Sequence, residues 1–404
     1  MRRILLADAD AFYVAVARRV DPEGAGRAAL LIVGGRPGSR GVVCSASYEA
    51  RAFGVRSAMP ISRALRLCPK AMCVPVPRGE CSRLSRRIAS VLSRFTPIVE
   101  SASIDEWYLD LSGTEALYRH EALADTARRI RGAVFAETGL SVSLGGGTNR
   151  LVAKLAVELA KPRPGNAATG VHVIEPGGEA VFMRQFTLGD IPGVGPRFRA
   201  RLEAVGLRTV SDLLATNDAT LARSLGESES TWLLARARGL DVHPVVSRQA
   251  SRSISHEETF ERDISDDSTL ERELLALSAL LTGDLRAHHL TARTVNVKLR
   301  DADFRTRRAS RTLALPVIGD RVIFETARDL LRKLRRARRV PARLLGIALT
   351  SLDESGAESQ LSLLEEPSAG TETNRDRALA RTVDKVRAKF GRGAIGPGPV
   401  TVKR

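Results

Sequence analysis

The chain has 404 residues, 43% of them hydrophobic, and this length predicts two to four packed domains. Lys and Arg number 63 against 46 Asp and Glu, which gives a formal net charge of +17. No run of eighteen apolar residues occurs, which excludes a membrane-spanning helix, and the apolar segment 4–7 is too short for a signal-peptide core. We therefore expect a soluble, cytoplasmic protein.

The positive charge is unevenly placed along the chain. Segment 293–343 alone contains 16 basic and 5 acidic residues. A field of that sign attracts polyanions and speeds their arrival, although a generally arginine-rich proteome would give a similar total charge. The four cysteines form no CxxC pair and have no histidine at zinc spacing, so free thiols in a reducing compartment are expected; they are Cys44, Cys68, Cys73 and Cys81.

The first half of the chain mixes strands with covering helices, as in an α/β or α+β fold. Strands are expected at 3–7, 29–33, 42–46, 98–103, 107–111 and 141–145. Helical spacing predicts a helix after the first strand as far as residue 17, and further helices at 61–68, 80–95, 121–137 and 149–160. The glycine-rich segment 34–41 lacks the Gly-Lys-Ser/Thr ending of a P-loop and predicts a hairpin turn.

From about residue 186 the pattern changes to short helices with glycine turns. Segment 239–253 has no periodicity and predicts an extended basic linker. Beyond it, the pattern predicts a separate domain of about 100 residues, with helices at 269–287 and 320–337 and strands at 292–300, 305–315 and 343–352. After Asp353 the chain is polar and weakly patterned, except for a helical pattern at 373–390.

Three acidic residues stand out by their apolar surroundings. Asp8 ends an apolar strand, where a carboxylate is not buried without a partner, and Asp105 and Glu106 are adjacent with apolar residues on both sides. Because neighbours in a strand point to opposite faces, a turn or bulge is needed for both to face one cation. Carboxylates from two strand ends suit Mg²⁺, and paired ions activate a hydroxyl and stabilise leaving oxygens. For a single Asp, a turn or cap residue is the alternative.

Four segments in this order and spacing resemble the motifs of the Y-family DNA polymerases, which copy damaged templates. The first and second catalytic motifs are matched by DADAFY (8–13) and SIDEWYLD (103–110). The finger signature is matched by VVCSASYEAR followed by FGV (42–55), and the palm helix by NRLVAKLAVELAKP (149–162). The branch most similar is the DinB-like group, which includes bacterial DNA polymerase IV.

The resemblance covers about residues 1–352 and implies an α+β multidomain fold, the right hand of polymerases. It implies a palm (1–18 and 76–166), fingers (19–75), a helical thumb with a helix-hairpin-helix (167–238), a linker (239–249), an α/β little finger (250–352) and a tail (353–404).

The resemblance also implies roles for single residues. Asp8, Asp105 and Glu106, with the Ala9 carbonyl, would hold two Mg²⁺ ions. Tyr13, beside Phe12, would be a steric gate against the 2′-hydroxyl of a ribonucleotide. Tyr48, Arg51 and Lys161 would bind the incoming triphosphate. Without the motif, these three would be interpreted as a core aromatic, a surface charge and a helix C-terminal lysine. Asp10 and Asp110 are expected to be structural.

Contacts to primer-template DNA are expected in three places. Segment 191–195 resembles a helix-hairpin-helix in which Gly193 and Gly195 let the backbone approach a phosphate, with an ordinary interhelical turn as the alternative. The basic linker would contribute Arg248 and Arg252. The last domain would contribute arginines that lie on or between its strands, where alternate side chains share one face: Arg300, Arg305, Arg307, Arg308 and Arg311.

The tail segment 360–364 resembles the peptide with which bacterial polymerases bind a sliding clamp. Its anchors would be Gln360, Leu361, Leu363 and Leu364, although a short apolar run also arises by chance.

Three positions depart from the family pattern: Trp107 in place of a small residue, Arg150 in place of a lysine, and Cys81 in place of an aromatic. We expect Trp107, beside the acidic pair, to alter metal geometry or primer placement.

The expected function is low-fidelity DNA synthesis from dNTPs by a monomer, without proofreading because no exonuclease pattern is present. The alternatives are an inactive DNA-binding relative that recruits partners at damaged DNA, a nucleotidyl cyclase of the palm type, and a basic DNA-binding regulator.

Overall fold

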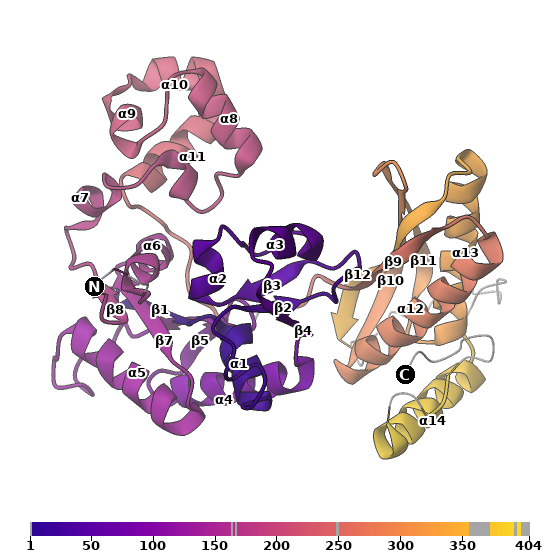
Figure 1. The fold of residues 1–404 in the computed structure, drawn as a ribbon. Coiled ribbons are helices and arrows are strands. Elements are labelled where there is room, and N and C mark those ends of the chain that lie inside the picture. The colour runs from indigo at the N-terminus through magenta and orange to yellow at the C-terminus, as the bar shows by residue number, and fades with distance from the viewer. Residues whose placement is uncertain are drawn as a thin grey trace, which may run out of the picture. The chain divides into compact units, whose positions relative to one another are not determined.

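A computed structural model describes residues 2–162, 165, 168–247, 250–354, 372–391 and 394–396 (Figure 1). The chain divides into two compact units, residues 1–249 and 250–404. No helix within the described ranges is long and apolar enough to cross a membrane.

The first unit is built on a five-stranded sheet of order β5-β6-β1-β7-β8. Its strands are β1 (Ile4–Ala9), β5 (Ile98–Ser101), β6 (Glu106–Asp110), β7 (Val142–Gly147) and β8 (Val171–Val173). The helices around it are α1 (Phe12–Val20), α4 (Arg78–Leu92), α5 (Leu123–Thr138) and α6 (Arg150–Ala160). Strand β1 is buried along its whole length and packs in two directions: Leu5 and Ala7 meet the core of α1, α4 and α5, whereas Ile4 and Leu6 meet α6.

Glycine in β7 sets the distance between the sheet and α6. A Cβ atom on Gly145 would lie 2.1 Å from the Val157 nitrogen and 2.3 Å from the Ala153 carbonyl oxygen, both in the α6 backbone. Any side chain here would push the helix away from the sheet. The helix therefore lies close enough for its polar side chains to reach β1 and β6.

A smaller sheet of order β3-β2-β4 contains β2 (Leu31–Gly34), β3 (Val43–Ala46) and β4 (Met72–Val74). β2 and β3 are antiparallel, so the hairpin predicted for 34–41 is confirmed. Helices α2 (Tyr48–Ala52) and α3 (Ile61–Leu67) complete its core around Ile32, Val55 and Ile61. β4 and α2 were not predicted; each has only three to five residues, too short for a periodic pattern.

Short helices follow, as the glycine turns predicted. They are α7 (Glu179–Met183), the 3-10 turn η1 (Leu188–Asp190), α8 (Pro196–Ala204), α9 (Val210–Ala215), α10 (Asp218–Leu225) and α11 (Glu227–Ala237). Their shared core includes Ile191, Leu202 and Leu233, and it also includes Leu151 and Leu155 of α6.

The second unit is a four-stranded antiparallel sheet of order β11-β10-β12-β9, with helices on one face. Its strands are β9 (Ser253–Ile264), β10 (Leu290–Asp301), β11 (Thr306–Val317) and β12 (Ala342–Glu354). Its helices are α12 (Asp267–Ala287), α13 (Asp320–Ala337) and α14 (Asn374–Phe390). β9 was not predicted, because this edge strand is polar on both faces and buries only Phe260.

A buried carboxylate joins the β10–β11 hairpin to the end of α13. The Asp301 side chain is fully buried and is bound by Arg307 at 2.8 Å and by Arg338 at 2.6 Å. Arg338 also binds Asp303, which is half exposed. Two carboxylates thus share one arginine in very different surroundings.

Replacing Asp301 with Asn should lower the free energy of unfolding of the protein by roughly 3–5 kcal/mol, because two arginines lose a buried partner. The matched control Asp303→Asn removes an exposed charge from the same arginine, and its effect should be much smaller. Urea unfolding followed by circular dichroism would measure both variants. Equal effects of the two substitutions would contradict this account of the hairpin.

Candidate active site

Asp8 and Glu106 face each other across two neighbouring strands. β1 and β6 are antiparallel, and Asp8 is the direct partner of Glu106 in their register. Their Cβ atoms are therefore about 4.5–5.5 Å apart on the same face of the sheet. Asp105 precedes β6 in a turn, so the irregularity predicted between the two acidic neighbours is confirmed.

The turn holds Asp105 at the same end of the sheet. The Ala9 amide donates to the Asp105 carbonyl oxygen at 2.9 Å, and the Ser103 hydroxyl donates to Asp105 Oδ1 at 2.5 Å. Asp10, expected to be structural, accepts hydrogen bonds from the Ser141 and Ser143 hydroxyls, both at 2.7 Å.

Two lysines of the α6 segment contact these carboxylates. Lys161 Nζ lies 2.8 Å from Asp8 Oδ2 and 2.6 Å from Glu158 Oε1. Lys154 Nζ lies 2.5 Å from Glu106 Oε1. Lys154 was not predicted as a site residue. Its distance of seven residues from Lys161, two helical turns, was the available signal, because it places both lysines on one face.

Burial and the neighbouring lysines act in opposite directions on the protonation of Asp8. Burial raises the pKa of Asp8 to about 7 although the Lys161 ammonium opposes the shift, and Glu106 raises it further. Burial alone would lower the pKa of Lys161, but Asp8 and Glu158 outweigh it and raise that pKa above its ordinary value. An added cation would favour the ionised form of Asp8.

The residues at this position fit divalent ions by their chemistry. The donors are carboxylate oxygens of Asp8, Asp105 and Glu106, with the Ala9 carbonyl beside them, and hard oxygen ligands of this kind suit Mg²⁺. As the side chains lie, no three His, Cys, Asp or Glu groups in the described part of the chain are arranged around a common ion position. Lysine ammonium groups lie against Asp8 and Glu106 instead.

Tyr13 lies next to the carboxylates and Phe12 lies behind it. Helix α1 starts after Ala11, whose left-handed backbone (φ 45°) turns the chain sharply at the end of β1. The Phe12 side chain is buried in the core and packs edge-on against the Tyr13 ring, with the two ring centres 5.6 Å apart. Burial and then the Asp105 carboxylate raise the pKa of Tyr13.

Tyr48 and Arg51 form a pair at the start of α2, where Ser47 caps the helix. The Arg51 guanidinium lies 5.1 Å from the centre of the Tyr48 ring, and its Nε donates to the Ala46 carbonyl oxygen at 2.9 Å. The structure thus places these two predicted triphosphate contacts together on one short helix.

Trp107 points away from the carboxylates of the site. It is fully buried and pairs with Ala7 of β1, on the sheet face opposite to Glu106. Cys81 is buried in the same core.

Arg150 attaches the segment after α11 to the sheet. Its guanidinium lies 4.1 Å from the centre of the Tyr108 ring and binds Glu100 at 2.9 Å and the Pro244 carbonyl oxygen at 3.1 Å. Glu100 also accepts from the Val246 amide at 3.0 Å. A lysine ammonium could not form these planar, two-pronged contacts. The contacts therefore explain why an arginine stands at position 150, where a lysine is common in the family.

The two predicted helix-hairpin-helix glycines differ in their surroundings. Gly193 has φ +101°, and a Cβ there would lie 2.9 Å from the Trp232 ring. The backbone conformation and the Trp232 ring therefore explain the glycine at this position without a DNA contact. Gly195 precedes α8, and nothing lies within 4 Å of its missing Cβ, which leaves its backbone open to a phosphate.

The five arginines predicted to contact DNA in the second unit divide between the two faces of its sheet and a turn. Arg300 and Arg308 lie on the sheet face without helices, together with Lys298, and Arg305 lies in the exposed hairpin turn. Arg307 and Arg311 lie on the helix-covered face: Arg307 binds buried Asp301, and Arg311 binds Asp329 of α13. Arg307 is therefore a structural residue.

The linker predicted for 239–253 ends earlier, because Ser253 already belongs to β9, and Arg252 is exposed just before it. Arg248 and the clamp-like anchors Gln360, Leu361, Leu363 and Leu364 lie outside the described residues.

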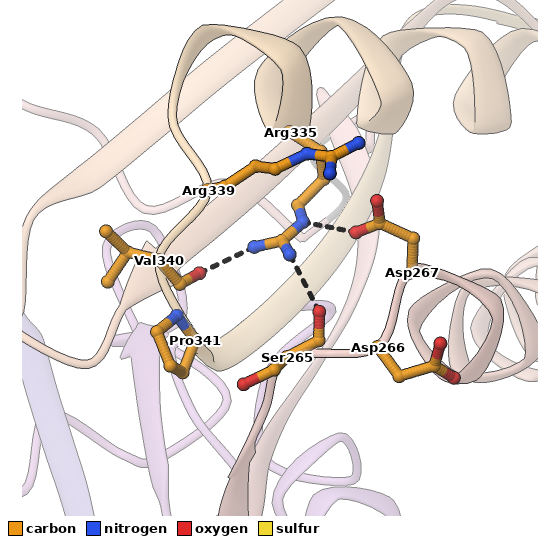
Figure 2. Close-up of a pocket in the computed structure, with 7 residues that line it drawn as sticks. All are labelled: Ser265, Asp266, Asp267, Arg335, Arg339, Val340 and Pro341. Atoms are coloured by element: carbon orange, nitrogen blue, oxygen red, sulfur yellow. Dashed lines mark hydrogen bonds and ion pairs between the residues drawn. The ribbon is translucent and has the colours of Figure 1, made fainter.

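A cavity of about 410 Å³ in the second unit contains none of the predicted site residues. Figure 2 shows Arg335 in its lining, with the guanidinium bound to Asp267 and to the Ser265 and Val340 carbonyl oxygens. It is a structural joint between α12 and α13. The lining residues are Ser265, Asp266, Asp267, Arg335, Arg339, Val340 and Pro341.

Comparison with known proteins adds to this geometry. The chain matches the impB/mucB/samB family over residues 7–158, the C-terminal domain of that family over 251–363, and the DNA polymerase-iota thumb domain over 189–241. DNA polymerase IV of Dehalococcoides mccartyi is 35% identical over 398 residues, covering 98% of this chain and 97% of the relative. DNA polymerase IV of Gluconobacter oxydans is 38% identical over 366 residues, covering 90% and 99%.

Solved structures agree with these matches. The crystal structure of DinB from Sulfolobus solfataricus matches with a TM-score of 0.58 at 25% identity, covering 86% of this chain and 98% of that one. A Y-family DNA polymerase chimera matches in fold with a TM-score of 0.76 at 24% identity, covering 87% and 99%. A chain with three ordered family domains and near full-length likeness to such relatives belongs to the impB/mucB/samB family, the Y-family DNA polymerases.

Proposed function

We propose that this chain is a template-directed DNA polymerase that extends a primer 3′-hydroxyl with dNTPs and copies damaged templates. The observation that supports it most is the meeting of Asp8, Asp105 and Glu106 at one sheet end, in a chain whose relatives are named DNA polymerase IV. The alternative of an inactive DNA-binding relative has no support, since all three carboxylates are present.

The domains follow the right hand of the family. We assign the five-stranded sheet to the palm, the β3-β2-β4 sheet to the fingers, the helices α7–α11 to the thumb and the second unit to the little finger. Asp8, Asp105, Glu106 and the Ala9 carbonyl would hold two Mg²⁺ ions. Ions bound there would activate the primer 3′-hydroxyl as a nucleophile and stabilise the negative charge on the leaving pyrophosphate.

The other residues bind and orient the nucleotide. Lys161, Arg51 and Tyr48 bind the triphosphate, and Lys154 neutralises Glu106 between catalytic cycles. Tyr13 lies flat beside the sugar and excludes a 2′-hydroxyl. The small, exposed Ala58 would leave space at the new base pair, so the correct pair is only modestly preferred and fidelity is low.

The partners are primer-template DNA, dNTPs and a sliding clamp, which segment 360–364 would bind. Lys298, Arg300 and Arg308 on the open sheet face would contact DNA phosphates, as would Gly195. We expect the protein to act as a monomer without proofreading.

The double variant Asp105→Asn, Glu106→Gln should lose primer extension by roughly a thousandfold or more, because several kcal/mol of transition-state stabilisation disappear. Primer extension on an undamaged template with Mg²⁺ measures this. Duplex binding should persist in the variant. No extension by the wild type, with tight DNA binding, would favour the inactive relative.

Lys154→Met should lower the Mg²⁺ concentration that gives half-maximal dNTP insertion by roughly two- to fivefold, because the Lys154 ammonium no longer competes with the ion for Glu106 while the side-chain volume is kept. Single-nucleotide insertion kinetics give the value. Lys70→Met, which removes an exposed lysine outside the site, serves as the control and should behave like the wild type.

Tyr13→Ala should reduce the preference for deoxyribonucleotides over ribonucleotides by about 10–200-fold. This is the selectivity that a pocket gains by excluding one small group, here the 2′-hydroxyl. Parallel insertion of dNTP and the matching NTP measures the ratio. An unchanged ratio would remove Tyr13 from sugar selection, and Phe53→Ala, an exposed aromatic, is the control.

A further inference from the structure

The C-terminal helix α14 is held to the second unit mainly by charged pairs. Arg286 of α12 binds Asp384 through two bonds, of 2.6 and 2.9 Å, and Arg321 of α13 binds Asp376 through two bonds, of 3.1 and 2.9 Å. Apolar packing is slight, because Ala380 is the one α14 side chain that is fully buried. Figure 1 shows α14 beside α12.

The acidic residues of α14 and four of its basic residues lie on different faces of the helix. α14 contains two acidic residues, Asp376 and Asp384, and both face the unit and are paired. Four of its exposed cations have no acidic partner within the described residues, whereas Arg377 binds Glu372; the four are Arg375, Arg381, Lys385 and Lys389. The outer face of α14, defined by these four residues, is therefore cationic without an acidic group.

The spacing on this face favours a polyanion. Arg381, Lys385 and Lys389 follow one another at four-residue intervals, about 6 Å of helix rise each, on one side of the helix. Like charges at this spacing destabilise a helix. A phosphate backbone, with one charge per about 1.7 Å of duplex axis, would place anions beside every one of them.

The outer face of α14 is separate from the open sheet face of the same unit. α14 docks where α12 ends and α13 begins, near the first residues of β10. Arg300 is ten residues further along β10, roughly 33 Å at 3.3 Å per residue. Contacts at both places involve different phosphates.

We propose that the outer face of α14 binds the phosphate backbone of a DNA segment beyond the one held by the open sheet face. This rests on the proposed function, in which the second unit binds DNA. Recognition is electrostatic and independent of base sequence, since the helix offers arginine and lysine and no base-reading groups in a fixed arrangement.

The test is the salt dependence of binding to a long duplex, measured by fluorescence anisotropy. In the variant Arg381→Gln, Lys385→Gln, Lys389→Gln the slope of log K against log salt should decrease by about two to three, since each phosphate contact contributes about 0.9. Glutamine keeps helix propensity, and far-UV circular dichroism would verify folding. Primer extension on a short primer-template should be unchanged.

A control removes three exposed cations from the first unit: Arg27→Gln, Arg86→Gln, Arg128→Gln. Its slope should remain that of the wild type. An unchanged slope in the α14 variant, or an equal decrease in the control, would overturn the proposal. Absence of primer extension by the wild type would instead count against the polymerase function, because the slopes are measured without catalysis.

Discussion

The burial of the Asp8 carboxylate, with Glu106 directly opposite it, is the constraint on which the active-site end of the first unit depends. Register places the two acidic side chains directly opposite each other, at a partly buried position where like charges are costly. Lys154 and Lys161 offset this cost. They reach the strands because Gly145 lets α6 lie against the sheet. Sheet register, glycine and helix form one electrostatic arrangement.

Much of this arrangement is visible in the sequence, because apolar periodicity and the order of four motifs predict the strands, α6 and the turn at Asp105. Side-chain direction is less visible. Trp107 is a neighbour of Glu106 in the chain, yet alternation in β6 sends it into the opposite core. Lys154 belongs to no ligand type associated with the metal, so the sequence offers only its spacing from Lys161, and its contact with Glu106 depends on the packing of α6.

Other features depend on contacts between distant segments. The covered face of the second sheet is set by α12 and α13, so alternation alone could not tell that Arg307 and Arg311 point inward while Arg300 and Arg308 do not. β9 gains its strand conformation from β12, since its own residues are mostly polar. The pairing of Arg286 with Asp384 joins residues 98 positions apart, which no local pattern predicts.

Strand β1 gives the site an unusual sensitivity to chain length. Its alternate residues serve two different cores, and Asp8 belongs to the same series as Ile4 and Leu6. One residue inserted or deleted ahead of Asp8 would turn that carboxylate into the apolar core and bring an alanine to the site. Tolerance to length changes should therefore be lowest in this strand, where folding and chemistry share one register.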